Sequence, residues 1–428
     1  MTRICLLSDG YPPWERGGAQ KIAAQLAEGY ARRGREVAVV TTVPDRSETG
    51  ESVVSDAGVG VRRLWTPRWR RALPYLTVSN PLAARGVADF LDGFDPDAIH
   101  VHNAHYLSNA AVAAAGECDA PVVKTYHDAG TFAYGEYTAH VADAPRNLPV
   151  AGSAYRADPV RQAREQGLRY FPLRNRHNRR TLRRHVDVGV AVSDALRRAL
   201  TANGMPCHRT VHNGVDAAAF RAVLGAAASE DEAFRDAYGL DDARIVLFGG
   251  RTGYTKGGAH LAAAFGRVAD RTDDDVRLLV TGDDEFAARM RALAAPHGEK
   301  VVTTGWIPRA DLRRAFRAAA VVATPSVHLD PFPTVNLEAL AAGTPVVTTR
   351  FGGASELVDD GATGRVVDPR DVGELADALE SFLGDPERAD EAGRRGRRLV
   401  RDRFTVEGQV EAYLDLFETL EAGPSPRD

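Results

Sequence analysis

Short runs of apolar residues along the chain alternate with longer stretches in which apolar residues recur every three or four positions. Residues 3–8 form such a run, residues 18–33 have the helical period and end at Gly34, and residues 36–42 form the next run. A strand, a helix and a second strand in this order predict a βαβ unit, in which helices cover a parallel sheet. Further buried strands are expected at residues 97–102, 122–125, 186–192 and 209–212.

The same alternation begins again after the sequence HNGVD (212–216) and an acidic, alanine-rich stretch. It predicts strands at residues 244–249, 276–281, 301–304, 320–324, 345–349 and 364–367. Helices are predicted between them, at residues 257–270, 285–294, 309–318, 335–342 and 371–383. The pattern therefore predicts the α/β class, with two doubly wound, Rossmann-like domains (1–212 and 213–404) and a helical end (405–428).

Length and composition agree with two globular domains. The 428 residues exceed what one hydrophobic core usually supports, and 44% are hydrophobic and 26% charged. A net charge of −4 gives no overall attraction to nucleic acid or to anionic lipid. Three isolated cysteines argue against a disulfide framework and favour a cytoplasmic location. No run approaches the roughly 20 apolar residues of a membrane span, so only surface contact with a membrane stays open.

Ligands of open parallel sheets bind beyond the carboxyl ends of the strands. The sequence RTGYTKGG, residues 251–258, lies in such a position and carries Arg251 and Lys256. Of the 54 basic residues only four are lysines, so this lysine is unusual for the chain. A planar guanidinium and a compact ammonium together suit a diphosphate. The loop does not fit the Walker pattern, and a solvated turn is the alternative.

A second loop, SVHLDPFPTVNLEALAAGTPVV (326–347), precedes a predicted helix. Pro333 holds its backbone extended, Thr334 is the expected N-cap, and the helix should end at Gly343. Asp330 then lies in the loop and Glu338 about one turn inside the helix. Both carboxylates could accept hydrogen bonds from sugar hydroxyls, although an acid in a first turn is also a common partner of the helix dipole.

These motifs resemble the nucleotide-sugar half of the retaining GT-B glycosyltransferases, specifically family 4. The resemblance rests on the Asp-x7-Glu stretch, on ALAAGTPVVTTRFGGASELV after it, and on Lys256-Gly257 before it. SDGYPPWERGGAQK, AVSDALRRAL and HNGVD resemble the same family, so the similarity spans roughly residues 3–420. It implies an acceptor-binding first domain, a nucleotide-sugar-binding second domain, a cleft between facing sheets, and a C-terminal helix that crosses back to the first domain.

The resemblance also implies roles for single residues of the second half. Arg251 and Lys256 match the cations that hold the donor diphosphate, and Glu338 matches the acid that binds the ribose hydroxyls. Asp330 matches the first acid of the usual Glu-x7-Glu, beside the donor sugar, with a shorter side chain than the family glutamate. The remaining expected donor contacts are Trp306 and Ile307, which border the nucleobase in GWIP, and Phe332, Pro333 and Thr334.

In the first half, Gly17 and Gly18 match a loop that closes near the diphosphate, and His127 matches a histidine near the transferred sugar. An ordinary helix start and a structural histidine are the alternatives. His100, His102 and His105 lack a carboxylate set for a metal and are interpreted as structural. The arginine-rich residues 156–184 and 65–75 fit either a phosphorylated or lipid acceptor or a solvated surface.

The expected activity is that of a hexosyltransferase that retains the anomeric configuration by front-face attack and needs neither metal nor cofactor. A nucleotide-sugar epimerase or phosphorylase on the same scaffold is the main alternative, and a non-catalytic sugar-nucleotide sensor is another. A dinucleotide-dependent oxidoreductase is weaker, because no GxGxxG follows the first strand of either half. A UDP-sugar is the default donor, while the acceptor and the oligomeric state stay open.

Overall fold

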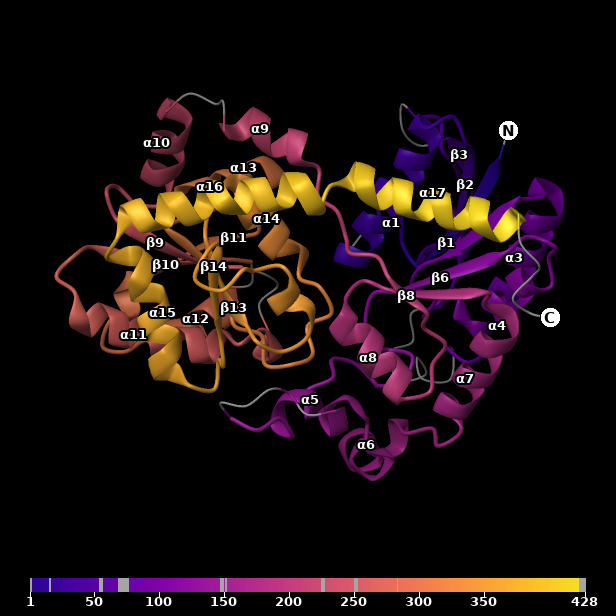
Figure 1. The fold of residues 1–428 in the computed structure, drawn as a ribbon, viewed down its shortest axis with the longest axis horizontal. Helices are drawn as coiled ribbons and strands as arrows, with labels where there is room; N and C mark the ends of the chain where they lie inside the picture. The colour runs from indigo at the N-terminus through magenta and orange to yellow at the C-terminus, as the bar shows by residue number, and fades with distance from the viewer. Residues whose placement is uncertain are drawn as a thin grey trace. The chain divides into compact units, whose positions relative to one another are not determined.

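The computed structural model describes residues 2–14, 17–53, 57–67, 77–146, 150, 152–224, 228–249, 253–282 and 284–422. The chain forms two compact units, drawn in Figure 1. The first contains Met1–Tyr137, Tyr155–Gly214 and Val406–Asp428. The second contains Thr138–Ala154 and Val215–Thr405. The chain therefore passes between the units four times.

The first unit is built on a sheet with the order β3-β4-β2-β1-β5-β6-β7-β8. Its strands are β1 (Arg3–Ser8), β2 (Glu36–Val43), β3 (Gly50–Val53), β4 (Gly60–Trp65), β5 (Ala98–Val101), β6 (Val122–Tyr126), β7 (Val188–Ala191) and β8 (Arg209–Thr210). All pair in parallel except β3, which pairs antiparallel with β4 at one edge. The strand order reverses between β1 and β5, which is where doubly wound folds bind ligands.

Helices cover both faces of this sheet. They are α1 (Gly18–Arg32), α3 (Pro81–Phe94), α4 (Ser108–Gly116), α6 (Pro159–Gln166), α7 (Arg174–His185), α8 (Asp194–Ala202) and α17 (Val406–Ala422), with the short turns η1 (Arg46–Glu48) and η3 (Gly167–Arg169). Helix α17, the last of the chain, packs beside α1 (Figure 1). Tyr30, Tyr413 and Phe417 are fully buried between these helices and the sheet.

The second unit has the sheet order β11-β10-β9-β12-β13-β14, all parallel. Its strands are β9 (Arg244–Phe248), β10 (Val276–Thr281), β11 (Val301–Gly305), β12 (Val321–Thr324), β13 (Val346–Thr349) and β14 (Gly364–Val367). Counted within this unit the order is 3-2-1-4-5-6, the Rossmann order. The order reverses between β9 and β12.

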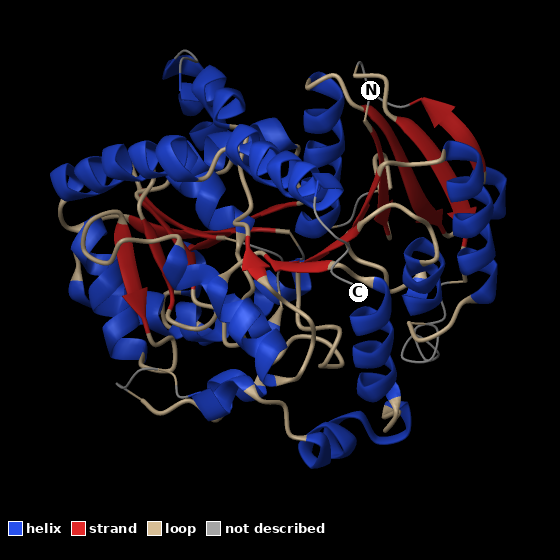
Figure 2. Cartoon of the chain, turned by 45° about the vertical axis from the view of Figure 1, so that its right-hand side comes forward, coloured by secondary structure: helices blue, strands red, loops and turns tan. Residues whose placement is uncertain are grey.

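Helices also lie on both faces of the second sheet (Figure 2). They are α5 (Ala139–Ala142), α9 (Ala217–Leu224), α10 (Ala228–Ala237), α11 (Gly258–Arg271), α12 (Asp284–Leu293), α13 (Arg309–Ala318), α14 (Thr334–Ala342), α15 (Val372–Leu383) and α16 (Pro386–Arg403). The short turns are η2 (Gly152–Tyr155, whose last residue belongs to the first unit), η4 (Tyr254–Lys256), η5 (Gly298–Lys300) and η6 (Gly353–Glu356). Phe265, Leu278 and Phe382 are central in the core.

The α/β class and both doubly wound domains are confirmed, but three local predictions are wrong. Strand β8 has two residues at the sheet edge and Arg209 is exposed, so this strand is not buried. Helix α14 begins at Thr334, with Pro333 as its N-cap and no side-chain cap. The predicted first domain included Thr138–Ala154, which packs within the second unit.

Candidate functional site

Two loops meet at the point where the strand order of the second sheet reverses. One follows β9 and ends in η4, which carries Lys256, and the other follows β12 and carries Asp330. Because β9 and β12 are neighbours, the loops at their carboxyl ends come together. Lys256 Nζ lies 2.8 Å from Asp330 Oδ2, with 21% of the lysine side chain and 5% of the aspartate side chain exposed. The structure therefore pairs two side chains that lie 74 positions apart.

Asp330 is surrounded by hydrogen-bond donors. The hydroxyl of Ser326 donates to Oδ2 at 2.8 Å, and His328 Nε2 lies 3.6 Å from the same oxygen. Burial acts to raise the pKa of Asp330, but Lys256, His328 and the Ser326 hydroxyl together outweigh it and lower the pKa to about 2. Asp330 is therefore a buried carboxylate that stays ionised at neutral pH.

Backbone contacts hold Asp330 from a third loop, which follows β13. Asp330 and Gly352 form a parallel bridge, and the backbone N–H of Gly353 donates to the Asp330 carbonyl at 2.8 Å. Gly352 has φ = 79°, and a Cβ there would lie 2.1 Å from the Asp330 carbonyl oxygen. Only glycine allows this close approach, so the Gly-Gly pair after β13 fixes the backbone of the aspartate.

The Lys256 loop is attached to the Asp330 loop in a similar way. The backbone N–H of Val327 donates to the Thr255 carbonyl at 2.7 Å. Gly257 has φ = 77°, and a Cβ there would lie 1.8 Å from the Pro325 carbonyl oxygen. The two loops therefore touch through backbone atoms on both sides of Lys256.

Helix α14 is anchored to the strand ends by a buried polar network. Asn336 in its first turn is hydrogen bonded to Thr324 at 2.8 Å and to Thr348 at 3.0 Å, at the ends of β12 and β13. Phe332, in the loop before the helix, is buried against Phe404 with ring centroids 6.0 Å apart. Glu338 lies half-buried on the same helix. Pro333 and Thr334 begin the helix, so these predicted donor contacts share one loop and helix with Asp330.

Other predicted donor residues are not brought to this pair by any contact among the described residues. Trp306 and Ile307 follow β11, the edge strand, where the tryptophan is 78% exposed. Arg251 lies outside the described residues. Their place in a donor site stays a prediction.

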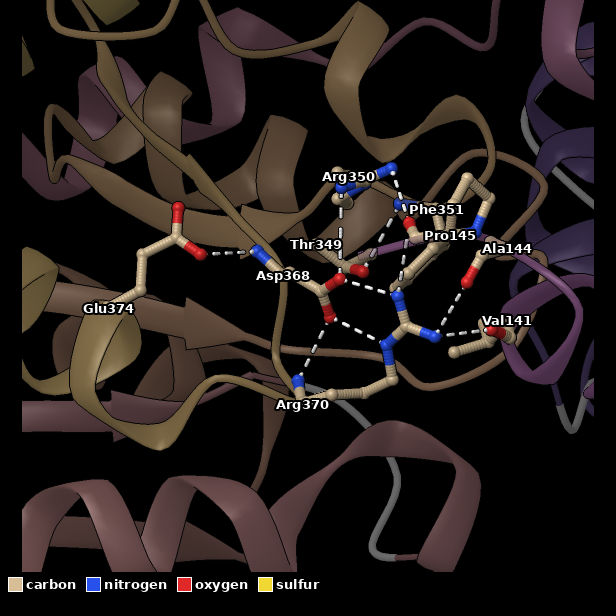
Figure 3. A network of polar contacts seen from close by, with 9 residues as sticks. All are labelled: Val141, Ala144, Pro145, Thr349, Arg350, Phe351, Asp368, Arg370 and Glu374. Atoms are coloured by element: carbon tan, nitrogen blue, oxygen red, sulfur yellow. Dashed lines mark hydrogen bonds and ion pairs between the residues drawn. The ribbon is translucent and has the colours of Figure 1, made fainter. Parts of the chain in front are cut away.

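A segment from the first half of the sequence packs within the second unit, against the loops around Asp330. We call it the strap, Thr138–Ala154. The guanidinium of Arg370 donates to the carbonyl oxygens of Val141 at 2.8 Å and Ala144 at 3.0 Å (Figure 3). Asp368 holds the same guanidinium at 2.6 Å. These carbonyls close the short helix α5, so a cation there also meets the negative end of the helix dipole.

In the first unit, the reversal point between β1 and β5 holds a buried acid. Asp9 accepts backbone N–H bonds from His105 at 2.6 Å, Tyr106 at 2.8 Å and Leu107 at 3.1 Å. Burial raises the pKa of Asp9 despite His105 and these three bonds. Asp9 therefore joins the ends of β1 and β5.

Gly17 and Gly18 lie at the start of α1, which follows β1. Gly17 is the N-cap residue with φ = −163°, an extended conformation open to any residue. No described heavy atom lies within 4 Å of a Cβ built on Gly17. Neither the backbone conformation nor the described packing therefore explains a glycine at this position.

His127 lies at the carboxyl end of β6, half-buried, with Nε2 2.8 Å from His102 Nδ1. Burial lowers the pKa of His127 to about 4, and Lys124 adds to the effect while Asp128 opposes it. Lys124 donates to the His102 carbonyl at 3.0 Å, and burial lowers its pKa to about 8. His127, Lys124 and Asp128, together with His105, are among the residues that line a small cavity of about 30 Å³.

The other two histidines of HVHNAH have partners within the first unit. His100 is bonded to the hydroxyls of Tyr30 at 3.1 Å and Thr125 at 2.8 Å. His105 lies 3.4 Å from Asp128. Within the described ranges no group of three His, Cys, Asp or Glu side chains could hold a metal ion. Nor does any described helix have the length and apolar character needed to cross a membrane.

Sequence reasoning missed the residues that hold Asp330 in place. Ser326 and His328 are four and two positions before it, and such polar side chains within an otherwise apolar loop are the signal that could have indicated them. Gly352 was visible only as part of the family-like stretch. Arg370 had no sequence signal, because the carbonyls of Val141 and Ala144, to which it donates, are more than 200 positions away.

Comparison with protein families matches most of the chain. Residues 17–214 match the glycosyl transferase 4-like domain, and residues 230–399 match the glycosyl transferases group 1. The alpha-maltose-1-phosphate synthase of Mycolicibacterium smegmatis is 30% identical over 308 residues, which cover 68% of this chain and 78% of that protein. YtcC of Bacillus subtilis is 30% identical over 221 residues, which span about half of this chain and 54% of YtcC.

Solved structures show the same GT-B architecture. The sucrose-phosphate synthase of Thermosynechococcus elongatus has a TM-score of 0.71 at 22% identity, over 99% of this chain and 100% of that one. Anabaena HepE, solved in complex with UDP and glucose, has a TM-score of 0.70 at 18% identity, over 98% of this chain and 100% of that one. At these identities the likeness shows the fold alone.

Proposed function

The chain belongs to the group 1 glycosyltransferases, and we propose that it moves a hexose from a nucleoside-diphosphate sugar to an acceptor hydroxyl with retention of configuration. The observation that carries the proposal is the Lys256–Asp330 pair at the reversal point of the second sheet. This pair places a cation and an ionised carboxylate where Rossmann-type sheets bind nucleotides. A diphosphate and a sugar are the two parts of a donor that need these two charges.

Lys256 stabilises the departing nucleoside diphosphate. Breaking the anomeric C–O bond adds about one negative charge to the diphosphate, so a fixed cation stabilises the transition state more than the ground state. Asp330 lies 2.8 Å from the ammonium group of this lysine and neutralises it. Arg251, on the same loop, is proposed to provide the second cation. No metal ion and no cofactor is needed in this proposal, because the two side chains supply the positive charge.

Asp330 holds hydroxyls of the transferred sugar. A retaining glycosidase uses two carboxyl groups about 5 Å apart, one of which attacks the anomeric carbon. The described polar side chains at Asp330 are instead those of Lys256, Ser326 and His328. This favours front-face attack, in which the leaving phosphate deprotonates the acceptor hydroxyl. A trapped glycosyl adduct on Asp330 would contradict that mechanism.

The other contacts follow the same division of roles. Glu338 binds the ribose hydroxyls from α14, while Trp306 and Ile307 border the nucleobase. Gly17 and Gly18 bring backbone amides to the diphosphate, and His127 positions the sugar. The low pKa of His127 keeps its side chain a neutral imidazole at physiological pH. A UDP-sugar is the proposed donor, supported by the UDP found in HepE.

Nucleotide binding tests the donor class. UDP, GDP, ADP and dTDP are compared for the rise in melting temperature they cause, with and without chelator, on wild type, Lys256→Ala and Arg251→Ala. We expect UDP to stabilise the wild type with or without chelator, and each variant to lose most of the shift. No stabilisation of the wild type by any of the four would overturn the donor assignment.

Turnover tests the role of Lys256 itself. Loss of one such charge-stabilising group costs about 3 kcal/mol of barrier, so Lys256→Ala should lose 10² to 10³ in kcat and still fold. Lys300→Ala, in η5, is the matched control and should keep wild-type turnover. Near-normal turnover of a folded Lys256→Ala enzyme would remove the diphosphate role.

A further inference from the structure

The strap, Thr138–Ala154, is held to the second unit by a clamp of two arginines around one buried acid. The Asp368 side chain is 3% exposed, accepts from Arg370 Nη2 at 2.6 Å and Nε at 2.9 Å, and lies 3.8 Å from Arg350. Burial acts to raise the pKa of Asp368, but the bonds from Arg370 outweigh it and lower the pKa. The acid therefore stays ionised and keeps both guanidinium groups in place.

Both arginines then reach the strap. Arg370 donates to the carbonyls of Val141 and Ala144, and Arg350 Nη2 donates to the Pro145 carbonyl at 3.3 Å (Figure 3). These acceptors are backbone atoms at the end of α5, so the clamp recognises the fold of the strap and not its side chains. The planar guanidinium group of arginine can donate to several carbonyls at once, which suits this contact better than the ammonium group of lysine.

Described side chains of the strap pack on the two loops that hold Asp330. Val141 and Ala144 form one apolar cluster with Val327 and Phe351. His140 is fully buried and meets the Phe351 ring edge-on at 6.1 Å. Val327 belongs to the Asp330 loop, and Phe351 directly precedes the Gly352–Gly353 pair that bonds the Asp330 backbone.

Phe351 is the residue that joins the clamp to the site. Its ring is fully buried, with the guanidinium carbons of Arg350 and Arg370 at 5.4 and 5.1 Å from its centroid. The pKa of His140 is lowered to about 4, mainly by burial. His328, which lies near Asp330, contributes to this shift. The strap therefore contacts the surroundings of Asp330 through Phe351 and Val327.

We infer that Arg370 is a positioning residue for sugar transfer: by holding the strap against Phe351 and Val327, it fixes the carboxylate of Asp330 in the geometry that the donor sugar needs. The inference rests on the proposed function, in which Asp330 binds the transferred sugar. Arg370 touches no substrate in this role. Binding of the nucleoside diphosphate, which the proposed function assigns to Lys256 and Arg251 and not to Asp330, should not depend on the strap.

Arg370→Gln tests the inference with three measurements. Trypsin cleavage after the exposed Arg146, in the strap, should become at least tenfold faster. Turnover should fall about tenfold, while the dissociation constant for UDP should stay within twofold of wild type. Arg370→Lys keeps the positive charge but lacks the planar guanidinium, so its cleavage rate and turnover should lie between those of wild type and Arg370→Gln. Arg365→Gln is the matched control. Arg365 lies on β14, close in sequence to Arg370, but its ion pair is an exposed one with Asp360.

Removing Arg370 leaves Asp368 buried without its main partner, which could destabilise the whole unit. Val141→Ser is therefore the second variant, since it weakens strap packing and leaves the clamp intact. Faster cleavage with turnover within twofold of wild type, in either variant, would overturn the inference. So would parallel loss of UDP binding and turnover in both. A wild type that binds no nucleoside diphosphate would instead overturn the proposed function, and this inference with it.

Discussion

At the scale of single residues, the charge of Asp330 is the property on which the proposed chemistry depends. The carboxylate has only 5% of its side chain exposed, yet Lys256, His328 and Ser326 keep its pKa near 2. An isolated buried acid would take up a proton, so one of its oxygens would become a donor and the carboxyl group would accept sugar hydroxyls more weakly. Lys256 neutralises this acid at 2.8 Å, and in the proposed function it also stabilises the leaving diphosphate.

Buried histidines make stability depend on pH. Burial lowers the pKa of His100 to about 3 and of His127 to about 4, below the usual 6.5, and that of His102 well below it. The unfolded chain takes up these protons first as the pH falls from 6.5, so the folded state loses stability between about pH 6.5 and 4. Each histidine contributes about 1.4 kcal/mol per pH unit in that window. Burial acts to lower the pKa of His105 as well, but Asp128 and Asp9 outweigh it and raise the pKa, so His105 opposes the effect in part.

Urea unfolding at pH 7.0, 6.0, 5.0 and 4.5 measures the effect. We expect the free energy of unfolding to decrease steadily below pH 6.5, and His100→Gln to show a smaller slope. Equal slopes for the variant and the wild type would contradict the assignment of His100.

At the scale of elements, the site depends on loops that touch through their backbones. Gly257 joins η4 to α11 in the left-handed region, against Pro325 of the neighbouring loop. Gly352 does the same after β13, against Asp330. In both places the absence of a side chain decides how close two loops can lie, and so how far Lys256 stands from Asp330.

Gly257→Ala separates backbone strain from loop contact. Gly361 has nearly the same φ, 76° against 77°, but no described atom lies within 4 Å of its Cβ position. Gly361→Ala should therefore cost only the left-handed penalty of about 1–2 kcal/mol. Gly257→Ala should cost about 1–3 kcal/mol more and weaken UDP binding at least tenfold. Equal unfolding free energies for the two variants would show that the loops do not press on each other.

At the scale of the whole molecule, the end of the chain completes the unit with which the chain began. Helix α17 follows the whole second unit in sequence, yet Tyr413 and Phe417 lie in the core of the first. A Cβ on Gly29 of α1 would lie 2.3 Å from a methyl carbon of Val410, so the two helices approach closely. Their exposed ion pairs, such as Arg33–Glu411, add little.

Phe417→Ala tests how far the first unit depends on α17. The ring is 1% exposed and contacts Tyr30 and His100, at centroid distances of 5.8 and 5.7 Å. Its removal should lower the free energy of unfolding by about 3–5 kcal/mol. Thr419→Ala, on an exposed position of the same helix, should change it by less than about 0.5 kcal/mol. A loss under about 1 kcal/mol for Phe417→Ala, measured by urea unfolding, would mean that α17 is dispensable.

The sequence by itself determined the two α/β domains, most element positions and the loops that carry Lys256 and Asp330. Helix α13 occupies the predicted residues 309–318, for example, because periodicity, glycines and prolines act over a few neighbouring residues. Only the tertiary structure decided that Lys256 pairs with Asp330, that the strap belongs to the second unit, and that Arg370 holds it. Such contacts join positions tens to hundreds of residues apart, and distance in sequence leaves no periodic signal from which they could be read.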